Sequence, residues 1–468
     1  MKVIIRCALF FALLGACLLI ASRILMRKEG LRKYSDLHAA LPRADVLFLG
    51  SSHVINGINP AELFDSCGIA SYNLGGHGST VPASYYELLL ALREASPALV
   101  VVDGYMAERE YTYLDLMTPE NTDAERENAV GQLHLNLDAF PLSRVKVYTV
   151  HALISDRKKR EEFLFPFLIY HDRWSGLTAD DPVPGMFSAQ ANRLLGGEIR
   201  TGVDWHIEPH EGEEEPATEP LYGETYLQMI LALCRERGID MAFTMLPFNT
   251  TPADRRTAAR LSVLAQAEGV PYLDLTAAGT DSLQGELFDD GHLNLIGMHR
   301  TTEAVGRFLA EQFDLPDRRG DADYSLWQRR AEEYRETLTG LQYGPERLTD
   351  ALSALAADPD APAAILYLRP EAAAIGDPAV RNLLDAVVPG NQLREAAAAG
   401  APALFLFSRG GEEVQDLCGY RTQDWQESVI GLTELVQVER FTGLYLDHDE
   451  SFNLLDMDEG RLSDAQLM

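Results

Sequence analysis

Two stretches far apart in the chain hold side chains that could do chemistry together. A Gly-Ser-Ser sequence, which ends at Ser52, follows the apolar run 46–49, and Asp289 stands three residues before His292. A serine hydroxyl becomes a strong nucleophile only when a base takes its proton, and that base needs a third group to fix its tautomer. The three-residue spacing lets the Asp289 carboxylate reach Nδ1 of His292, which leaves Nε2 to face a hydroxyl. The combination indicates nucleophilic catalysis by a serine.

The elements around the serines must place them at the edge of a sheet. From residue 45 onward, short apolar runs alternate with stretches whose apolar residues recur at helical spacing. The expected strands are residues 46–50, 71–75, 98–105, 240–248 and 270–275, and the expected helices include residues 83–95, 223–238 and 251–269. This alternation predicts a parallel sheet covered on both faces, and sites in such sheets form beyond the carboxyl ends of the strands. Ser51, Ser52 and His53 follow the first strand, so they lie at such an end.

The N-terminal segment is predicted to span a membrane. Residues 7–22 carry no charge, and the apolar character continues to Met26 around a single Arg23. This is about the 20 residues that one span needs, so a signal anchor fits better than a short cleaved signal peptide. A lipoprotein cleavage site ending at Cys17 is the alternative, although the apolar run continues past it. Flanking charges alone would keep the body of the chain in the cytoplasm by the positive-inside rule.

Charge and cysteine content argue against several classes of partner. The 468-residue chain has 40 Lys+Arg against 71 Asp+Glu, and its formal net charge of −31 repels nucleic-acid phosphates. Its five cysteines form no Cys-x-x-Cys pair and predict neither a disulfide framework nor a zinc site. His206 and His210 lie beside an acidic run at 213–215 with no third ligand evident, so that run is interpreted as a solvated loop. We predict no metal, no cofactor and no nucleic-acid partner.

The pattern divides the chain into four parts. We expect a membrane anchor at 1–34, an α/β domain at 35–315, a charged helical linker at 316–345 and a small α/β accessory domain at 346–468. The accessory part has strand candidates of its own and no catalytic constellation. Within the second part, the cluster Tyr170–Trp174 is interpreted as packing and salt bridging rather than catalysis.

The serine and histidine motifs resemble those of the SGNH/GDSL-type hydrolases over about residues 44–315. The first block of that family is a Gly-x-Ser turn after the first strand, and the last block is Asp-x-x-His, matched here by Asp289 and His292. The resemblance implies a flavodoxin-like three-layer α/β fold, with Ser52 as the nucleophile. His292 would be the general base, and Asp289 would orient it.

A middle block of the family supplies donors to the oxyanion hole. The stretch "YNLGGHGST" resembles it, and this implies that Asn73 and Gly78 serve the oxyanion or the substrate. His53 either contacts substrate or is a structural histidine. The family's third block normally carries an oxyanion-donating Asn, whereas Ala107 occupies the matching place here, and Asp103 is assigned no role. The loss of one such donor lowers the rate by about 10²–10³.

Within the family, the chain looks most like the membrane-anchored envelope branch, the relatives of the teichoic-acid D-alanylation protein and of the alginate O-acetylation proteins. The N-terminal anchor, "GSSHVINGINP", "YHDRW" and "DDGHLNLIG" carry this resemblance. It implies a single-pass protein of the cell membrane with an extracellular catalytic domain, which overrides the charge argument on topology. The implied substrates are acetyl or D-alanyl esters of envelope glycans or teichoic-acid-like polymers.

Two functions from different classes are therefore expected. The first is a serine esterase or O-acyltransferase, in which the acyl group passes from Ser52 to water or to a sugar or polyol hydroxyl. The second is a non-catalytic accessory protein with a vestigial triad. Either its anchor and α/β domain dock on a membrane-bound O-acyltransferase, or its C-terminal segment binds glycan. The missing Asn favours the second, and the presence of all three triad residues in the family's order favours the first.

Overall fold

The structure is a computed structural model. It describes residues 2–26, 36–108, 122–154, 156–177, 194–202, 209–210, 220–283, 285–343, 348–357, 363–368, 377–387, 398, 403–407, 440–446, 452–458 and 461–462. His206, the acidic run 213–215 and Cys418 lie outside these residues. The described chain forms two compact units, one of residues 1–198, 210–277 and 301–331, the other of residues 199–209, 278–300 and 332–468. Each is described by itself.

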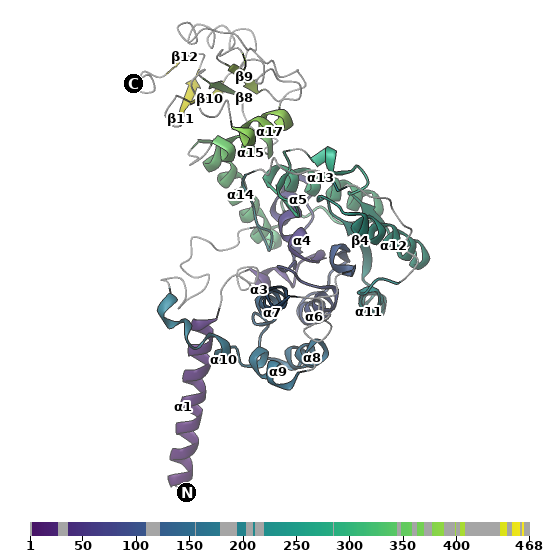
Figure 1. The fold of residues 1–468 in the computed structure, drawn as a ribbon, viewed down its shortest axis with the longest axis vertical. Helices are drawn as coiled ribbons and strands as arrows, with labels where there is room; N and C mark the ends of the chain where they lie inside the picture. The colour runs from purple at the N-terminus through teal and green to yellow at the C-terminus, as the bar shows by residue number, and fades with distance from the viewer. Residues whose placement is uncertain are drawn as a thin grey trace. The chain divides into compact units, whose positions relative to one another are not determined.

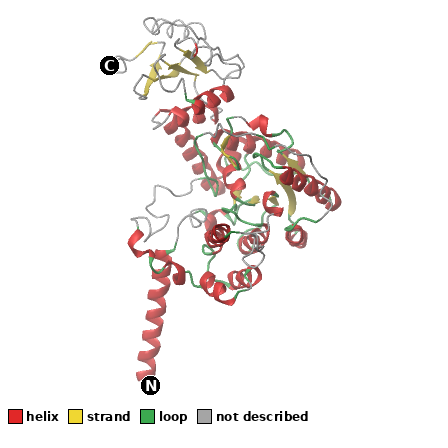
Figure 2. Ribbon diagram, viewed as in Figure 1, coloured by secondary structure: helices red, strands yellow, loops and turns green. Residues whose placement is uncertain are grey.

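The first unit is built on a five-stranded parallel sheet (Figure 1, Figure 2). Its strands are β1 (Val46–Leu49), β2 (Ser71–Asn73), β3 (Leu99–Asp103), β4 (Asp240–Met245) and β5 (Tyr272–Asp274). Their order is β2-β1-β3-β4-β5, the order of flavodoxin-like doubly wound sheets. The expected α/β fold with a parallel sheet is confirmed.

Both faces of this sheet are buried, which gives three layers. Along β1, Leu47 and Leu49 belong to one apolar core, and Val46 and Phe48 belong to another, because successive side chains of a strand point to opposite faces. The first core is covered by α6 (Val81–Ala91), α11 (Glu224–Arg237), α12 (Pro252–Glu268) and the start of α14 (Ser325–Tyr343). The second is covered by α4 (Ser52–Gly57), α5 (Pro60–Cys67) and α13 (Leu295–Gln312).

A helical segment follows the third strand. It comprises η1 (Tyr105–Glu108), α7 (Asp123–Leu137), α8 (Arg144–Leu153), α9 (Arg157–Leu164), α10 (Phe167–Tyr170) and η3 (Arg173–Gly176). Leu133, Leu137, Phe140, Val150 and Phe163 form its own apolar core. The segment reaches the end of the N-terminal helix α1 (Lys2–Leu25), where the Arg173 guanidinium donates to the carbonyls of Leu25 and Met26 at 2.8 and 3.0 Å.

The Tyr170–Trp174 cluster, expected to pack and to form salt bridges, makes hydrogen bonds to two other elements. The Tyr170 hydroxyl donates to Asp138, and the Arg173 guanidinium donates to the backbone carbonyls of Leu25 and Met26. The side chain of Trp174 is 71% exposed, so it packs little against the described chain. The cluster therefore attaches the helical segment to α1 without forming a packed aromatic core.

The first half of the helix predicted to be a linker packs into the first unit. Trp327 of α14 is fully buried in the core, and its Nε1 donates to the Ser71 carbonyl at 2.9 Å. Arg330 on the same helix pairs with Asp36 at 2.7 Å. The division between the compact units consequently falls inside α14, after residue 331, and not at the expected boundary of 315.

The second unit contains a hairpin and a second sheet. The hairpin is β6 (Leu287–Asp289) with β7 (His292–Leu293), and the short η4 (Thr280–Leu283) precedes it. The second sheet has the order β12-β11-β10-β8-β9 and lies with α15 (Leu348–Ala357) and α17 (Pro378–Val387) in the last part of the chain. Its strands are β8 (Ala363–Leu368), β9 (Ala403–Phe407), β10 (Arg440–Leu446), β11 (Phe452–Asp458) and β12 (Arg461–Leu462). The α/β character expected there is present.

Candidate active site

The turn after β1 places one serine in the interior and the other at the surface. Gly50 has φ +155°, and a Cβ atom on it would stand 2.5 Å from Cγ2 of Val54 and 3.0 Å from Cβ of Asp103. Only glycine fits that conformation and space. Ser51 is buried and caps α4, since its Oγ accepts a hydrogen bond from the His53 N–H at 3.3 Å. Ser52 is the first residue of α4 and is partly exposed, so the Ser52 hydroxyl is the better placed of the two for a substrate.

The glycine-rich loop after β2 lies directly against this turn. The Gly76 N–H donates to the Gly50 carbonyl at 3.1 Å, and a Cβ on Gly75 would be 2.9 Å from the Ser51 carbonyl oxygen. Gly78 has φ +57° and lies beside the Gln132 side chain. The loop predicted to serve the oxyanion therefore reaches the serine turn, and Gly78 has the left-handed conformation that favours glycine.

Asn73 is engaged in holding this arrangement together. Its Nδ2 donates to the Val54 carbonyl at 2.7 Å and to the Ile58 carbonyl at 3.0 Å, and its Oδ1 accepts from the Gly75 N–H at 2.9 Å. An amide group has only two N–H donors. Because both are used on carbonyls around α4, this conformation leaves no side-chain N–H of Asn73 for an oxyanion, one of the two roles expected from the sequence. The side chain positions the serine turn against the glycine loop.

His53 lies in an aromatic cluster at the carboxyl edge of the sheet. Its ring stacks on Tyr105 with centroids 3.5 Å apart and contacts the edge of Phe248 at 4.6 Å. These partners follow β3 and β4. With only 4% of His53 exposed, the structural interpretation is better supported than the substrate contact.

A buried carboxyl group, which we assigned no role from the sequence, stands next to the serine turn. Asp103 ends β3 and is 3% exposed. Burial raises the pKa of Asp103 to about 7, although the Leu246 and Tyr105 N–H groups and the Thr244 hydroxyl, which donate to it, oppose the shift. The Asp103 side chain thus joins the C-terminal ends of β3 and β4. Its pKa of about 7 means that it titrates near neutral pH.

Ala107 stands where the family resemblance would place an oxyanion-donating Asn. It lies in η1 and is fully buried, and its carbonyl accepts the Gly223 N–H at 2.7 Å. A methyl side chain donates no hydrogen bond.

The second unit holds the histidine and its partner in the β6–β7 hairpin. The Asp289 carboxylate contacts Nδ1 of His292 through Oδ1 at 2.7 Å and Oδ2 at 3.0 Å, and it accepts the Gly291 N–H at 3.0 Å. Burial alone would raise the pKa of Asp289, but the hydrogen bonds from His292 and Gly291 and the charges of His292 and Arg200 outweigh it and lower the pKa. The carboxylate stays ionised and fixes the imidazole through Nδ1.

Asn294, two residues after the histidine, anchors the hairpin to the next helix. Its Oδ1 accepts the N–H groups of Ile296 and Gly297, which begin α13, and its Nδ2 donates to the carbonyls of Gly202 and Gly285 at 2.9 and 2.8 Å. An Asn directly before a helical pattern signals such a cap. The cap fixes the chain that follows His292.

The candidate residues thus fall into two groups. Ser52, His53, Asn73 and Gly78 belong to the first unit, and the Asp289–His292 pair belongs to the second. Among the residues that the structure describes, no group of three His, Cys, Asp or Glu side chains could hold a metal ion.

Comparisons with known proteins add little. No family model and no curated protein matches the chain. Among solved structures, it is similar to the crystal structure of a "putative acylhydrolase" from Bacteroides fragilis, with 13% sequence identity and a TM-score of 0.30. The similarity covers 61% of this chain and 96% of that one. At this level the likeness assigns neither family nor activity.

Proposed function

We propose that the protein is a membrane-anchored serine esterase or O-acyltransferase. The Ser52 hydroxyl is the nucleophile, His292 is the base, and Asp289 orients His292. The observation that carries the proposal is the 2.7 Å contact between Asp289 and Nδ1 of His292, because it leaves Nε2 as the nitrogen that can take a proton. The partly exposed Ser52, which follows the constrained Gly50, supplies the matching hydroxyl.

The chemistry follows from these roles. Ser52 Oγ attacks the carbonyl carbon of an ester while its proton passes to His292 Nε2. The resulting oxyanion collapses, the alcohol leaves with that proton, and the acyl group remains on Ser52. A water or a polymer hydroxyl then attacks the acyl-serine and gives its proton to His292, and His292 passes a proton to Ser52 Oγ as that oxygen leaves. The N–H groups of Ser52 and Gly78 are the proposed oxyanion donors.

Turnover is expected to be slow without further help. The Ala107 side chain has no donor, and both side-chain donors of Asn73 bind carbonyls. One missing oxyanion donor reduces kcat by about 10²–10³. We propose that the acyl donor or a membrane-bound O-acyltransferase partner completes the hole.

The membrane and the envelope substrate belong to the same proposal. α1 is long and apolar enough to cross a membrane over Val3–Leu25, although a signal sequence has the same properties. The resemblance of the motifs to the envelope branch supports retention of α1, an extracellular catalytic domain, and acetyl or D-alanyl esters of envelope polymers as substrates.

The test is active-site labelling of the full chain in detergent with a fluorophosphonate probe. Ser52→Ala and His292→Ala are expected to lose labelling. Ser51→Ala is the matched control, because it removes a neighbouring hydroxyl that is buried and caps α4. It should retain labelling at a stability loss of about 1 kcal/mol. Undiminished labelling of Ser52→Ala would contradict the proposal. A folded wild-type protein that never labels would favour the accessory function.

A further inference from the structure

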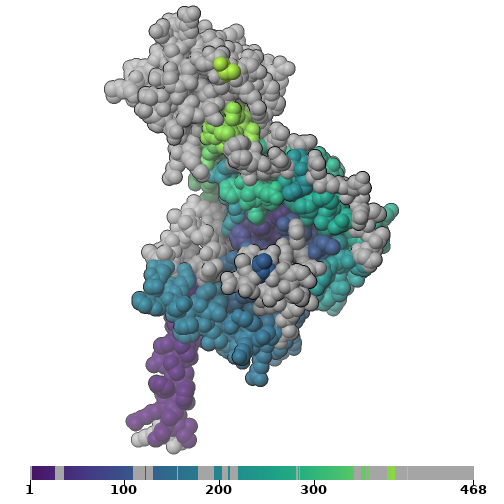
Figure 3. Space-filling model, viewed as in Figure 1, coloured from purple at the N-terminus to yellow at the C-terminus, as the bar shows by residue number. Residues whose placement is uncertain are grey.

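An apolar cavity lies between α1 and the helical segment, and none of the candidate catalytic residues lines it. Its volume is about 500 Å³. One wall comes from the second half of α1, with Leu18 and Leu19, and the other from the end of α9 and α10, with Leu164, Phe167 and Leu168. Figure 3 shows the helical segment, coloured blue, meeting the end of the purple α1. The cavity therefore adjoins the part of the chain that is long and apolar enough to cross a membrane.

The cavity has a cationic end. Arg23 of α1 and Lys146 of α8 both line it. Lys146 is 4% exposed, and its Nζ donates to the carbonyls of Asp138 and Phe140, both at 3.3 Å. The two residues share a cavity whose other lining residues are apolar, apart from Ser22 and Asp138. The Asp138 carboxylate offsets one of the two positive charges, and the remaining positive charge favours an anion.

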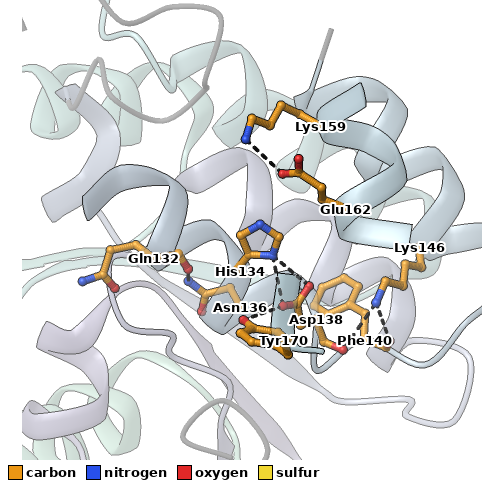
Figure 4. Close-up of polar contacts among 9 residues, drawn as sticks. All are labelled: Gln132, His134, Asn136, Asp138, Phe140, Lys146, Lys159, Glu162 and Tyr170. Atoms are coloured by element: carbon orange, nitrogen blue, oxygen red, sulfur yellow. Dashed lines mark hydrogen bonds and ion pairs between the residues drawn. The ribbon is translucent and has the colours of Figure 1, made fainter. Parts of the chain in front are cut away.

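The neighbouring carboxylate is already engaged, as Figure 4 shows. The Asp138 Oδ2 atom lies 3.0 Å from Nδ1 of His134 and accepts a hydrogen bond from the Tyr170 hydroxyl at 3.0 Å. Burial lowers the pKa of Lys146 to about 8; the charge of Asp138 opposes this shift, and the charge of Arg23 adds to it. An added negative charge would stabilise the lysine ammonium.

The surface beside the cavity suits the edge of a bilayer. Leu142, Phe165, Leu168 and Trp174 are all at least 50% exposed there. At 1.5 Å per residue, the α1 wall of the cavity from Gly15 to Arg23 spans roughly 12 Å, which is within the thickness of one hydrocarbon leaflet, roughly 15 Å. Exposed Leu and Phe with a Trp are typical of protein at that depth.

Basic residues precede this apolar stretch. α9 begins Arg-Lys-Lys-Arg over residues 157–160, and only Glu161 and Glu162 on the helix offset them. Basic clusters beside a membrane attract anionic lipid. The helical segment thus carries positive charge at the start of α9, just before the apolar residues 164–168 that line the cavity beside α1.

We propose that this cavity binds one anionic phospholipid of the surrounding bilayer. Its phosphate lies between Arg23 and Lys146, and an acyl chain lies along the apolar walls. A helix of a partner protein fits less well, because one helical turn alone fills roughly 400 Å³. The proposal rests on α1 remaining in the membrane and is independent of the triad.

The experiment is native mass spectrometry of the full chain from detergent with equal amounts of phosphatidylglycerol and phosphatidylcholine of the same chains. A 1:1 complex that favours phosphatidylglycerol is expected. Arg23→Gln with Lys146→Gln should weaken it about 20-fold. Arg93→Gln with Arg307→Gln removes the same charge at exposed sites elsewhere and should leave binding unchanged. Equal binding by the cavity variant, or no preference between lipids, would overturn the proposal.

A second measurement, photo-crosslinking of lipid, tests the same site in the wild-type protein. Phosphatidylglycerol with a diazirine in its acyl chain should crosslink wild-type protein in nanodiscs at Leu18, Leu19 and residues 164–168. Crosslinks spread evenly around α1 would mean ordinary annular lipid and would refute the site. A co-purified membrane protein crosslinked at these residues would refute it in favour of a protein occupant. Soluble glycerol phosphate should not displace the lipid, and displacement would exclude a role for the acyl chain.

Discussion

Gly50→Ala is the sharpest test of the serine turn. The substitution adds one methyl group to a residue whose φ is +155°, where L side chains are rarely found. The new Cβ would meet Cγ2 of Val54 at 2.5 Å and Cβ of Asp103 at 3.0 Å. Both neighbours are buried, so neither can move away cheaply.

The magnitude has two parts. Backbone strain at such a φ costs about 1–3 kcal/mol, and overpacking a filled core costs about 1–3 kcal/mol more. A total of about 4 kcal/mol corresponds to about a 10³-fold change in an opening equilibrium. We expect the backbone amides of β1 to exchange with deuterium about 10³-fold faster in Gly50→Ala than in the wild type.

The assay is hydrogen exchange with mass spectrometry on the full chain in detergent, read at peptides covering β1. Gly238→Ala is the matched control, because that residue has φ +67° and open space around its Cβ position. Gly238→Ala should lower the free energy of unfolding only by the backbone strain, about 1–2 kcal/mol. Exchange of β1 in Gly50→Ala within a few-fold of the wild type would refute the account of this turn.

Three further outcomes are expected. Asp289→Asn should lower ester turnover about 10³–10⁴-fold with little loss of stability, measured by p-nitrophenyl acetate hydrolysis, because the fixed tautomer is lost. The free energy of unfolding should fall by up to about 4 kcal/mol as the pH rises from about 4 to 7. The reason is that Asp103 keeps its proton until about pH 7 in the folded state, whereas the unfolded chain releases it near pH 4. Asp103→Asn should flatten this slope in urea midpoints measured between pH 5 and 8. Asn73→Ala should destabilise by about 2–4 kcal/mol in the same titration, because it leaves two carbonyls unsatisfied; a neutral effect would contradict its positioning role.

The sheet could be predicted because its signal is local. Strands β1 and β3 are almost wholly apolar, and the burial of both β1 faces follows directly from four consecutive apolar residues, Val46 to Leu49. The contact between Asp289 and Nδ1 of His292 was also predictable, since three residues on a turn set its geometry. These features need no knowledge of distant chain.

Other features depend on partners that the sequence does not place. The sequence predicts an oxyanion or substrate role for Asn73. In the structure its side-chain N–H groups donate to the carbonyls of Val54 and Ile58, which are 19 and 15 residues away in the chain. Trp327 belongs to a stretch that the sequence predicts to be a linker, but in the structure it is buried and donates to the Ser71 carbonyl. The raised pKa of Asp103 comes from burial by other strands, so no pattern near residue 103 announces it.

The chain leaves the first unit, forms part of the second and then returns to the first, and this order has a consequence for folding during synthesis. The first unit is closed only by residues 301–331, where Thr302 accepts the Asn59 N–H and Trp327 fills the core. On the ribosome these residues emerge after the hairpin that carries His292. Any nascent chain long enough to finish the parallel-sheet core therefore already contains Ser52, Asp289 and His292. A premature stop after residue 331 would spare all three residues, whereas an earlier stop, even one after His292, would leave that core incomplete.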